Sequence, residues 1–194
     1  MTEICAVNHK LVLHATQEMI TINGREFPLH SIDRVVLWAV SQRNNGSYMG
    51  TTFTVKVGCG QDHAYFFEQS GSRNDRYESA AATFEAITDL LRCNVIPRIA
   101  DSIVAAIGRG EKIALGGVGS TVLEPRGIGT KSPLSRPVPW DSIVGTAFEF
   151  GKLRLQTRPD GDDTTKHKLL IGMDQWNAVA IPAVVARLAP RFAT

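Results

Sequence analysis

The first half of the chain alternates short apolar runs with polar turns, a pattern that predicts antiparallel strands. Asn23-Gly24 lies between two of these runs and is a strong signal for a two-residue hairpin turn. The polar stretch 41–47 is predicted as a loop from its composition. Residues 52–57 alternate with a period of two, as a half-buried strand does. The predicted strands cover residues 10–14, 19–22, 25–29, 34–40, 52–57 and 63–68.

Helical spacing replaces this alternation after residue 74. Apolar residues recur at intervals of three and four from Ala80 to Leu91, which predicts an amphipathic helix over residues 75–93. Pro97 interrupts the pattern, and a second helical stretch covers residues 99–107. The first half therefore reads as a set of strands followed by helix.

The second half repeats this order with shorter segments. Its strand-like segments are followed by a closing helix predicted over residues 177–188. The strand-like segments are residues 112–123, 127–130, 138–143, 147–150, 152–157 and 168–171.

An internal repeat joins the two halves. Residues 27–32 (FPLHSI) and 138–143 (VPWDSI) share the pattern apolar, Pro, apolar, polar, Ser, Ile. Chance similarity between two β-rich segments is the alternative, and the shared order of elements argues against it. Ser31 and Ser142 occupy equivalent corners, where we expect each hydroxyl to bond to nearby backbone.

The corner at residues 139–143, together with the segments 110–112, 151–155 and 177–178, resembles bacterial proteins with pleckstrin-homology-like (PH-like) domains. The resemblance covers most of the second half and, more weakly, residues 10–92. It implies short antiparallel strands that curl into a barrel closed by one C-terminal helix. Its motifs carry no residue that is specific to a chemical reaction.

The expected fold class is therefore mainly β (α+β), with two tandem PH-like antiparallel β-barrels or sandwiches, each closed by a C-terminal α-helix. We expect a first domain at residues 1–96, a connecting helix and turn at 97–110, and a second domain at 111–194. Apolar helix residues would plug each barrel: Ala80, Phe84, Ile87 and Leu91 in the first, and Val179, Ile181, Val184, Val185 and Leu188 in the second.

Composition excludes several classes of protein. With 43% hydrophobic residues, the chain of 194 residues can bury a core, which excludes global disorder. The net charge of +2 is unevenly distributed. Residues 1–97 contain 8 basic and 10 acidic residues, and residues 98–194 contain 13 basic and 9 acidic residues. Neither half is basic enough for a nucleic-acid binder. The longest apolar run, residues 35–40, is far shorter than a transmembrane span, and the acidic N-terminus is unlike a secretory signal. We expect a cytoplasmic protein.

Motifs for catalysis or cofactor binding are weak. The glycine-rich stretches 116–121 and 127–132 lack the spacing and the following helix of dinucleotide or phosphate loops. Cys5, Cys59 and Cys93 lie far apart, which argues against a disulfide framework or a thiolate zinc site. No histidine has a ligand partner at helical spacing, so a metal site would need assembly from distant strands, which the sequence neither shows nor excludes. We predict no enzyme activity, no cofactor and no metal, although a site between the two barrels is left as an alternative.

The remaining candidate is a binding surface. Arg126, Lys131 and Arg136 are expected in one long loop of the second half, where basic residues can bind an anionic partner. The resemblance implies a non-catalytic binding or scaffolding module, with a protein partner at a sheet edge or at the groove beside the helix. The alternative is peripheral binding of anionic lipid head groups through the basic loop, and an ordinary solvated loop is the simpler interpretation. Exposed sheet edges also make a homodimer a candidate assembly.

Overall fold

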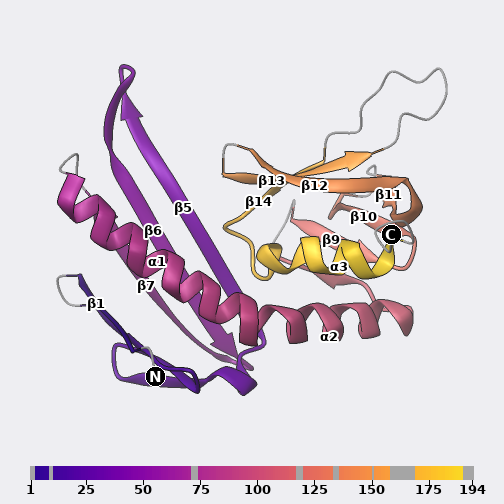
Figure 1. Ribbon diagram of the computed structural model, residues 1–194. Helices are drawn as coiled ribbons and strands as arrows, with labels where there is room; N and C mark the ends of the chain where they lie inside the picture. Colours follow the sequence, from indigo (N-terminus) through magenta and orange to yellow (C-terminus); the bar gives the residue numbers. More distant parts are fainter. Residues whose placement is uncertain are drawn as a thin grey trace. The chain divides into compact units, whose positions relative to one another are not determined.

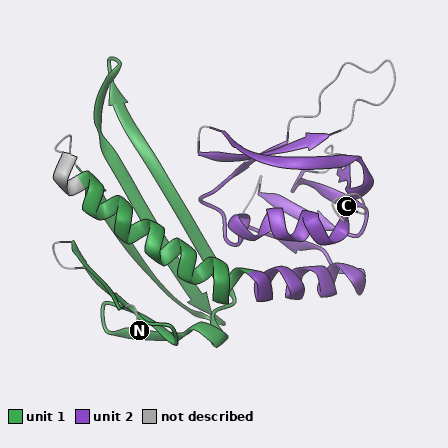
Figure 2. Ribbon diagram, in the orientation of Figure 1, with its two compact units in different colours: residues 1–96 green, residues 97–194 purple. Residues whose placement is uncertain are grey.

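The computed structural model describes residues 3–8, 11–70, 74–116, 120–132, 136–149, 151–157 and 169–189. The chain divides into two compact units, residues 1–96 and residues 97–194 (Figure 2). Among the described residues, no helix combines the length and the apolar character needed to cross a bilayer.

The first unit begins with a four-stranded antiparallel sheet in which each strand pairs with the next along the chain (Figure 1). Alternate residues point into the core, so that Leu13, Ile20, Ile22 and Phe27 are buried. Asn23 and Gly24 both adopt positive φ, which confirms the predicted two-residue turn. The strands are β1 (Ile4–Asn8), β2 (Leu11–Ala15), β3 (Met19–Ile22) and β4 (Arg25–Pro28).

A three-stranded antiparallel sheet follows, formed by β5 (Arg34–Asn44), β6 (Ser47–Cys59) and β7 (Asp62–Ser70). The loop predicted at residues 41–47 is wrong, because β5 and β6 remain paired up to Asn44 and Ser47. Asn45 and Gly46 take the positive φ angles that a two-residue turn requires, and backbone pairing does not depend on apolar side chains. The residues predicted as a loop from their polar composition therefore form the end of the long β5–β6 hairpin.

Helix α1 (Asn74–Asn94) lies against β1, β6 and β7 (Figure 1). Ala80, Ile87 and Leu91 are buried as predicted, and the ring of Phe84 lies 5.3 Å from that of Phe53 on β6. The helical spacing read from the sequence thus identifies the face that packs on the sheet.

The second unit begins with helix α2 (Ile96–Gly108), in which Pro97 occupies the first turn, where a missing N–H costs nothing. A four-stranded antiparallel sheet follows, and Leu123 and Ile128 form its buried cross-strand pair. Its strands are β8 (Ile113–Ala114), β9 (Thr121–Glu124), β10 (Gly127–Thr130) and β11 (Val138–Pro139).

A three-stranded sheet and a helix complete this unit. The sheet contains β12 (Ile143–Glu149), β13 (Lys152–Thr157) and β14 (Leu170–Gly172). A 3-10 turn, η3 (Ala178–Ala180), leads into helix α3 (Ile181–Leu188), which lies against β12. Ile181, Val184 and Val185 are buried, as the helical spacing predicted.

The corner between the two sheets has the same form in both units. A 3-10 turn, η1 (Leu29–Ser31) or η2 (Trp140–Ser142), directly follows the fourth strand. The Ser31 hydroxyl donates to the Pro28 carbonyl oxygen at 2.8 Å, and the Ser142 hydroxyl donates to the Pro139 carbonyl oxygen at 2.8 Å. These bonds confirm the expected role of the two serines.

The structure is mainly β, with several antiparallel sheets and a C-terminal helix. Among the described residues, backbone pairing does not join β4 to β5 or β11 to β12, and no closed barrel is formed. Each unit instead consists of a four-stranded sheet, a 3-10 corner, a three-stranded sheet and a helix, in that order.

Gly127 tests how closely β10 and β11 approach. A β-carbon added at Gly127 would overlap the Val138 carbonyl oxygen, whereas one added at Gly108 meets nothing within 4 Å. We expect Gly127→Ala to lower the free energy of unfolding by about 3 kcal/mol through this overlap. Gly108→Ala, at the end of α2, should change it by less than about 1 kcal/mol. Guanidinium denaturation followed by tryptophan fluorescence measures both, and equal effects would contradict the close approach.

Candidate functional site

The three predicted basic residues do not share one loop. Arg126 lies in the turn between β9 and β10, Lys131 directly follows β10, and Arg136 precedes β11 by two residues; all three are exposed. Because a strand rises about 3.3 Å per residue, Arg126 and Lys131 are separated by roughly 16 Å along β10. The prediction of one long loop is therefore wrong.

Lys131 and Arg136 do lie at the same end of one hairpin. Ile128 pairs with Val138, and continuing this antiparallel register places Arg136 opposite Thr130, beside Lys131. A β-carbon added at Gly129 would lie 3.2 Å from the Cα of Pro137, which shows how close the two strands remain here. The structure thus brings two of the three predicted residues together.

A cleft of about 430 Å³ lies beside Lys131 on the outer face of this sheet. Val122 and Gly129 are cross-strand neighbours that point away from the buried pair of Leu123 and Ile128. Gly129 is buried, and Pro137 lies over the position that a side chain of residue 129 would take. The cleft is lined by Lys112, Val122, Glu124, Gly129, Thr130, Lys131, Ser132 and Pro137.

Two lysines and one carboxylate set the charge of the cleft. The Nζ atom of Lys112 lies 2.6 Å from Oε2 of Glu124, whose side chain is only 16% exposed. Glu124 is held in place because its carbonyl oxygen accepts a 3.0 Å hydrogen bond from Nε1 of Trp140. With Lys112 matched by Glu124, Lys131 gives the cleft a net positive charge. The cleft can therefore hold a small anionic group.

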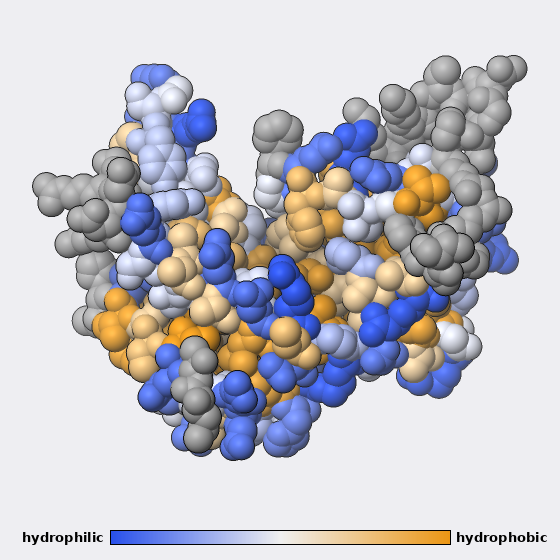
Figure 3. Space-filling view, in the orientation of Figure 1, coloured by the Kyte–Doolittle hydropathy of each residue, from blue (hydrophilic) through white to orange (hydrophobic). Residues whose placement is uncertain are grey.

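The edge of the second sheet in unit 1 is a separate candidate surface. In the described part of the chain, β5 pairs with β6 on one side, and no strand pairs with its other side. Ala39, Ser41 and Gln42 are exposed, and β5 has no proline and no charged residue between Arg34 at its start and Arg43, which follows a register shift. Natural proteins usually protect such edges with charges, prolines or bulges. Figure 3 shows hydrophilic side chains over the end of this hairpin, beyond the uncharged part of the edge.

Aromatic side chains lie on the face of the same sheet opposite α1. Tyr65 and Phe67 on β7 are 51% and 38% exposed, and their rings stack with centroids 6.4 Å apart. In the register of the sheet, Trp38 on β5 pairs with Thr54 on β6, which pairs with Phe67. Trp38 and Phe67 therefore lie on the same face of the sheet, on either side of Thr54.

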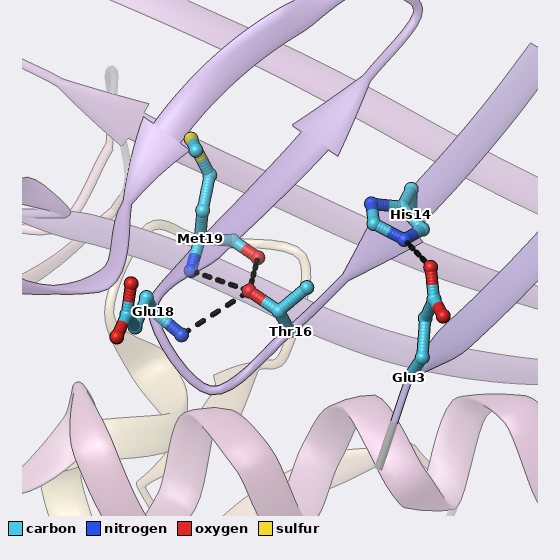
Figure 4. A network of polar contacts seen from close by, with 5 residues as sticks. All are labelled: Glu3, His14, Thr16, Glu18 and Met19. Carbon is cyan, nitrogen blue, oxygen red and sulfur yellow. Dashed lines mark hydrogen bonds and ion pairs between the residues drawn. The ribbon is translucent and has the colours of Figure 1, made fainter. Parts of the chain in front are cut away.

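A third group of residues was missed by the search for helical ligand spacing. Glu3, Cys5 and His14 place possible metal-ligand atoms within 4.8 Å of one another. Nε2 of His14 contacts Oε1 of Glu3 (Figure 4). The signal that connects them is the hairpin register, because Cys5 pairs directly with His14 across β1 and β2.

Thr16 holds the turn that follows this group. Its Oγ1 accepts hydrogen bonds from the backbone N–H groups of Glu18 at 3.3 Å and Met19 at 3.2 Å (Figure 4). The backbone N–H of Thr16 donates to the Met19 carbonyl oxygen at 2.9 Å. These bonds fix the end of β2 and the start of β3 and so support the position of His14.

A scan of protein-family models and searches of curated proteins and of solved structures give no match to the chain.

Glu68 is a carboxyl group placed among aromatic rings beneath α1. It lies on β7 and borders a small cavity with Phe53, Phe66 and Phe84. Burial raises the pKa of Glu68 above its ordinary value of 4.5, because the charged form loses contact with water. The folded state therefore favours the protonated form, and its stability falls as the pH rises past that value.

Replacing Glu68 tests this effect. We expect Glu68→Gln to raise the free energy of unfolding at pH 7.5, and we expect the gain to shrink as the pH is lowered toward 4.5. Glu85→Gln, at an exposed position on α1, is the matched control and should show neither change. Urea denaturation across this pH range measures the difference. A gain that is independent of pH would show that ionisation of Glu68 is not its cause.

Proposed function

We propose that this protein is a non-catalytic binding or scaffolding module made of two PH-like units, and that its main partners are proteins. The shared order of elements in the two units supports the PH-like assignment. The matching corners at Ser31 and Ser142 support descent of the two units from one repeated domain. The cleft beside Lys131 is lined by charged and polar residues, an arrangement that suits binding of a partner better than catalysis.

The outer part of β5 carries this proposal. An extended peptide can add to an exposed strand through backbone hydrogen bonds, while its alternate side chains enter neighbouring pockets. The segment from Trp38 to Gln42 offers such an edge without protecting charges. An edge of five residues is close to the length of an ordinary strand.

Side chains beside the edge would supply specificity. Trp38 and Val40 are half-buried on the face that also carries Phe67, so a bound strand would place alternate side chains near aromatic surface. Apolar or aromatic residues at alternate positions are therefore the expected feature of a partner segment.

Lysine substitutions at the edge test this mode of binding. Peptides that bind the full chain are first selected from a display library. Their affinities for the wild type and for the double variant Ala39→Lys with Ser41→Lys are then measured by fluorescence anisotropy. We expect the double variant to bind the peptides at least tenfold more weakly than the wild type. Charged residues on natural sheet edges oppose the addition of another strand, and each new lysine should do the same. Ser102→Lys, at an exposed position on α2, is the control and should bind as the wild type does.

Hydrogen exchange gives the same test without relying on the variants. A bound peptide should slow exchange of backbone amides in residues 38–43 of the wild type. Binding that leaves these amides unprotected, or that survives both lysine substitutions, would place the partner elsewhere.

The second candidate function is peripheral binding of anionic lipid, and the position of Lys131 and Arg136 at one hairpin end favours it. Each basic residue at an anionic surface contributes about 1 kcal/mol. Two residues at one end supply about 2 kcal/mol, a weak anchor by itself. Arg126 lies at the other end of β10 and would add little.

Vesicles of phosphatidylserine and phosphatidylcholine separate this candidate from the first. We expect Lys131→Ala combined with Arg136→Ala to lower the partition coefficient measured by co-sedimentation roughly thirtyfold. This factor corresponds to the loss of about 2 kcal/mol of binding free energy. Arg126→Ala is the control for Lys131→Ala alone, because each removes one basic residue, and it should keep most of the binding. Co-sedimentation that is absent, or that responds equally to all three arginine and lysine substitutions, would exclude a lipid site at this hairpin end.

A further inference from the structure

The outward face of the β1–β2 hairpin carries three side chains of metal-ligand type. Cys5 and His14 are direct cross-strand neighbours. Glu3 precedes Cys5 by two positions, so both residues point to the same side of the pleated strand. Glu3 and Cys5 are exposed and His14 is half-buried, so an ion can reach all three from solvent.

The distances within this group suit a small ion. The three candidate ligand atoms lie within 4.8 Å of one another. Ligands of a tetrahedral zinc ion, at bond lengths of about 2.0–2.3 Å, are separated by roughly 3.5 Å. Strand pairing already holds Cys5 opposite His14, so changes of side-chain rotamer would bring the ligand atoms closer together.

We propose that Glu3, Cys5 and His14 form a binding site for zinc or a similar divalent transition metal ion. Thiolate sulfur, imidazole nitrogen and carboxylate oxygen are the three donor types that Zn²⁺ takes in proteins. Ca²⁺ and Mg²⁺ prefer sites made of oxygen alone, so the cysteine and histidine select against them. Water would fill the fourth position.

Protons leave when the ion binds. The Cys5 thiol releases its proton to solvent to become a thiolate. The proton of the hydrogen bond between Nε2 of His14 and the Glu3 carboxylate also leaves, either to solvent or to Nδ1 of the same ring, so that Nε2 and the carboxylate both face the ion. No atom changes its oxidation state.

The site would fasten the edge of the first sheet. β1 is the outer strand in the order β1-β2-β3-β4, and its pairing with β2 is the only strand pairing it has among the described residues. An ion bound to ligands on both strands would cross-link them and stabilise the folded state as its concentration exceeds the dissociation constant. Sequence spacing within one element could not reveal this, since residues 5 and 14 meet only through the hairpin register.

Cobalt and zinc titrations of the full, reduced chain test the site. Co²⁺ serves as the spectroscopic probe, because a thiolate ligand gives a charge-transfer absorption band and tetrahedral geometry gives strong visible bands. We expect one Co²⁺ per chain, displaced by Zn²⁺. Cys5→Ser should remove the charge-transfer band, and His14→Ala and Glu3→Gln should each weaken binding at least tenfold.

Two matched controls come from the same chain. Cys93→Ser removes an exposed thiol on α1, and His30→Ala removes an exposed imidazole on η1; both should bind Co²⁺ as the wild type does. A band that survives Cys5→Ser, or that is lost equally with Cys93→Ser, overturns the proposal.

A second measurement uses the wild type alone and does not depend on the folding of any variant. Alkylation of each cysteine is followed by mass spectrometry with and without Zn²⁺. We expect Zn²⁺ to slow modification of Cys5 at least tenfold while that of Cys93 is unchanged, because a metal-bound thiolate is shielded from the reagent. Equal rates at both cysteines overturn the proposal.

Discussion

Antiparallel pairing of each strand with the next strand along the chain is the constraint on which this protein depends. In the described part of the chain, each of the four sheets pairs consecutive strands in this way. The register then decides which side chains meet. It brings Cys5 beside His14 and places Lys131 near Arg136, and it separates Arg126 from Lys131 by the length of β10.

The parts of the fold that local chemistry determines were predictable from sequence. Asn-Gly at residues 23–24 predicts its turn because both residues tolerate positive φ, and helical spacing identifies the buried face of α1. The same turn chemistry at Asn45-Gly46 was obscured by the polar residues around it, since composition says little about backbone pairing. β1 was missed although residues 4–7 form a continuous apolar run, because four apolar residues do not by themselves distinguish a strand from a turn of helix.

The candidate sites were less predictable because they depend on distances between elements. Charged residues that are close in sequence were expected in one loop, but a strand of four residues was enough to move Arg126 to the other end of the hairpin. The lining of the cleft beside Lys131 depends on the register that makes Val122 and Gly129 neighbours, and its charge depends on the ion pair between Lys112 and Glu124. Neither feature follows from the residue types alone. Both follow once the register of β9 and β10 is known.

The two units have the same order of elements but leave different surfaces open, and their backbone explains why. In the described part of unit 1, β5 is the outer strand of its sheet, so its uncharged edge from Trp38 to Gln42 remains available for pairing. In unit 2, β12 is shorter and carries a register shift near its start, which limits strand addition there. Its candidate surface is the cleft that Val122 and Gly129 line together with Lys112 and Lys131. Residues 1–97 are net acidic and residues 98–194 are net basic, which agrees with the lysines that line the cleft of unit 2. Backbone edges can bind extended chains whatever their charge, whereas a lysine-lined cleft favours anions. Under the proposed function, the shared architecture would therefore serve two kinds of recognition in one chain.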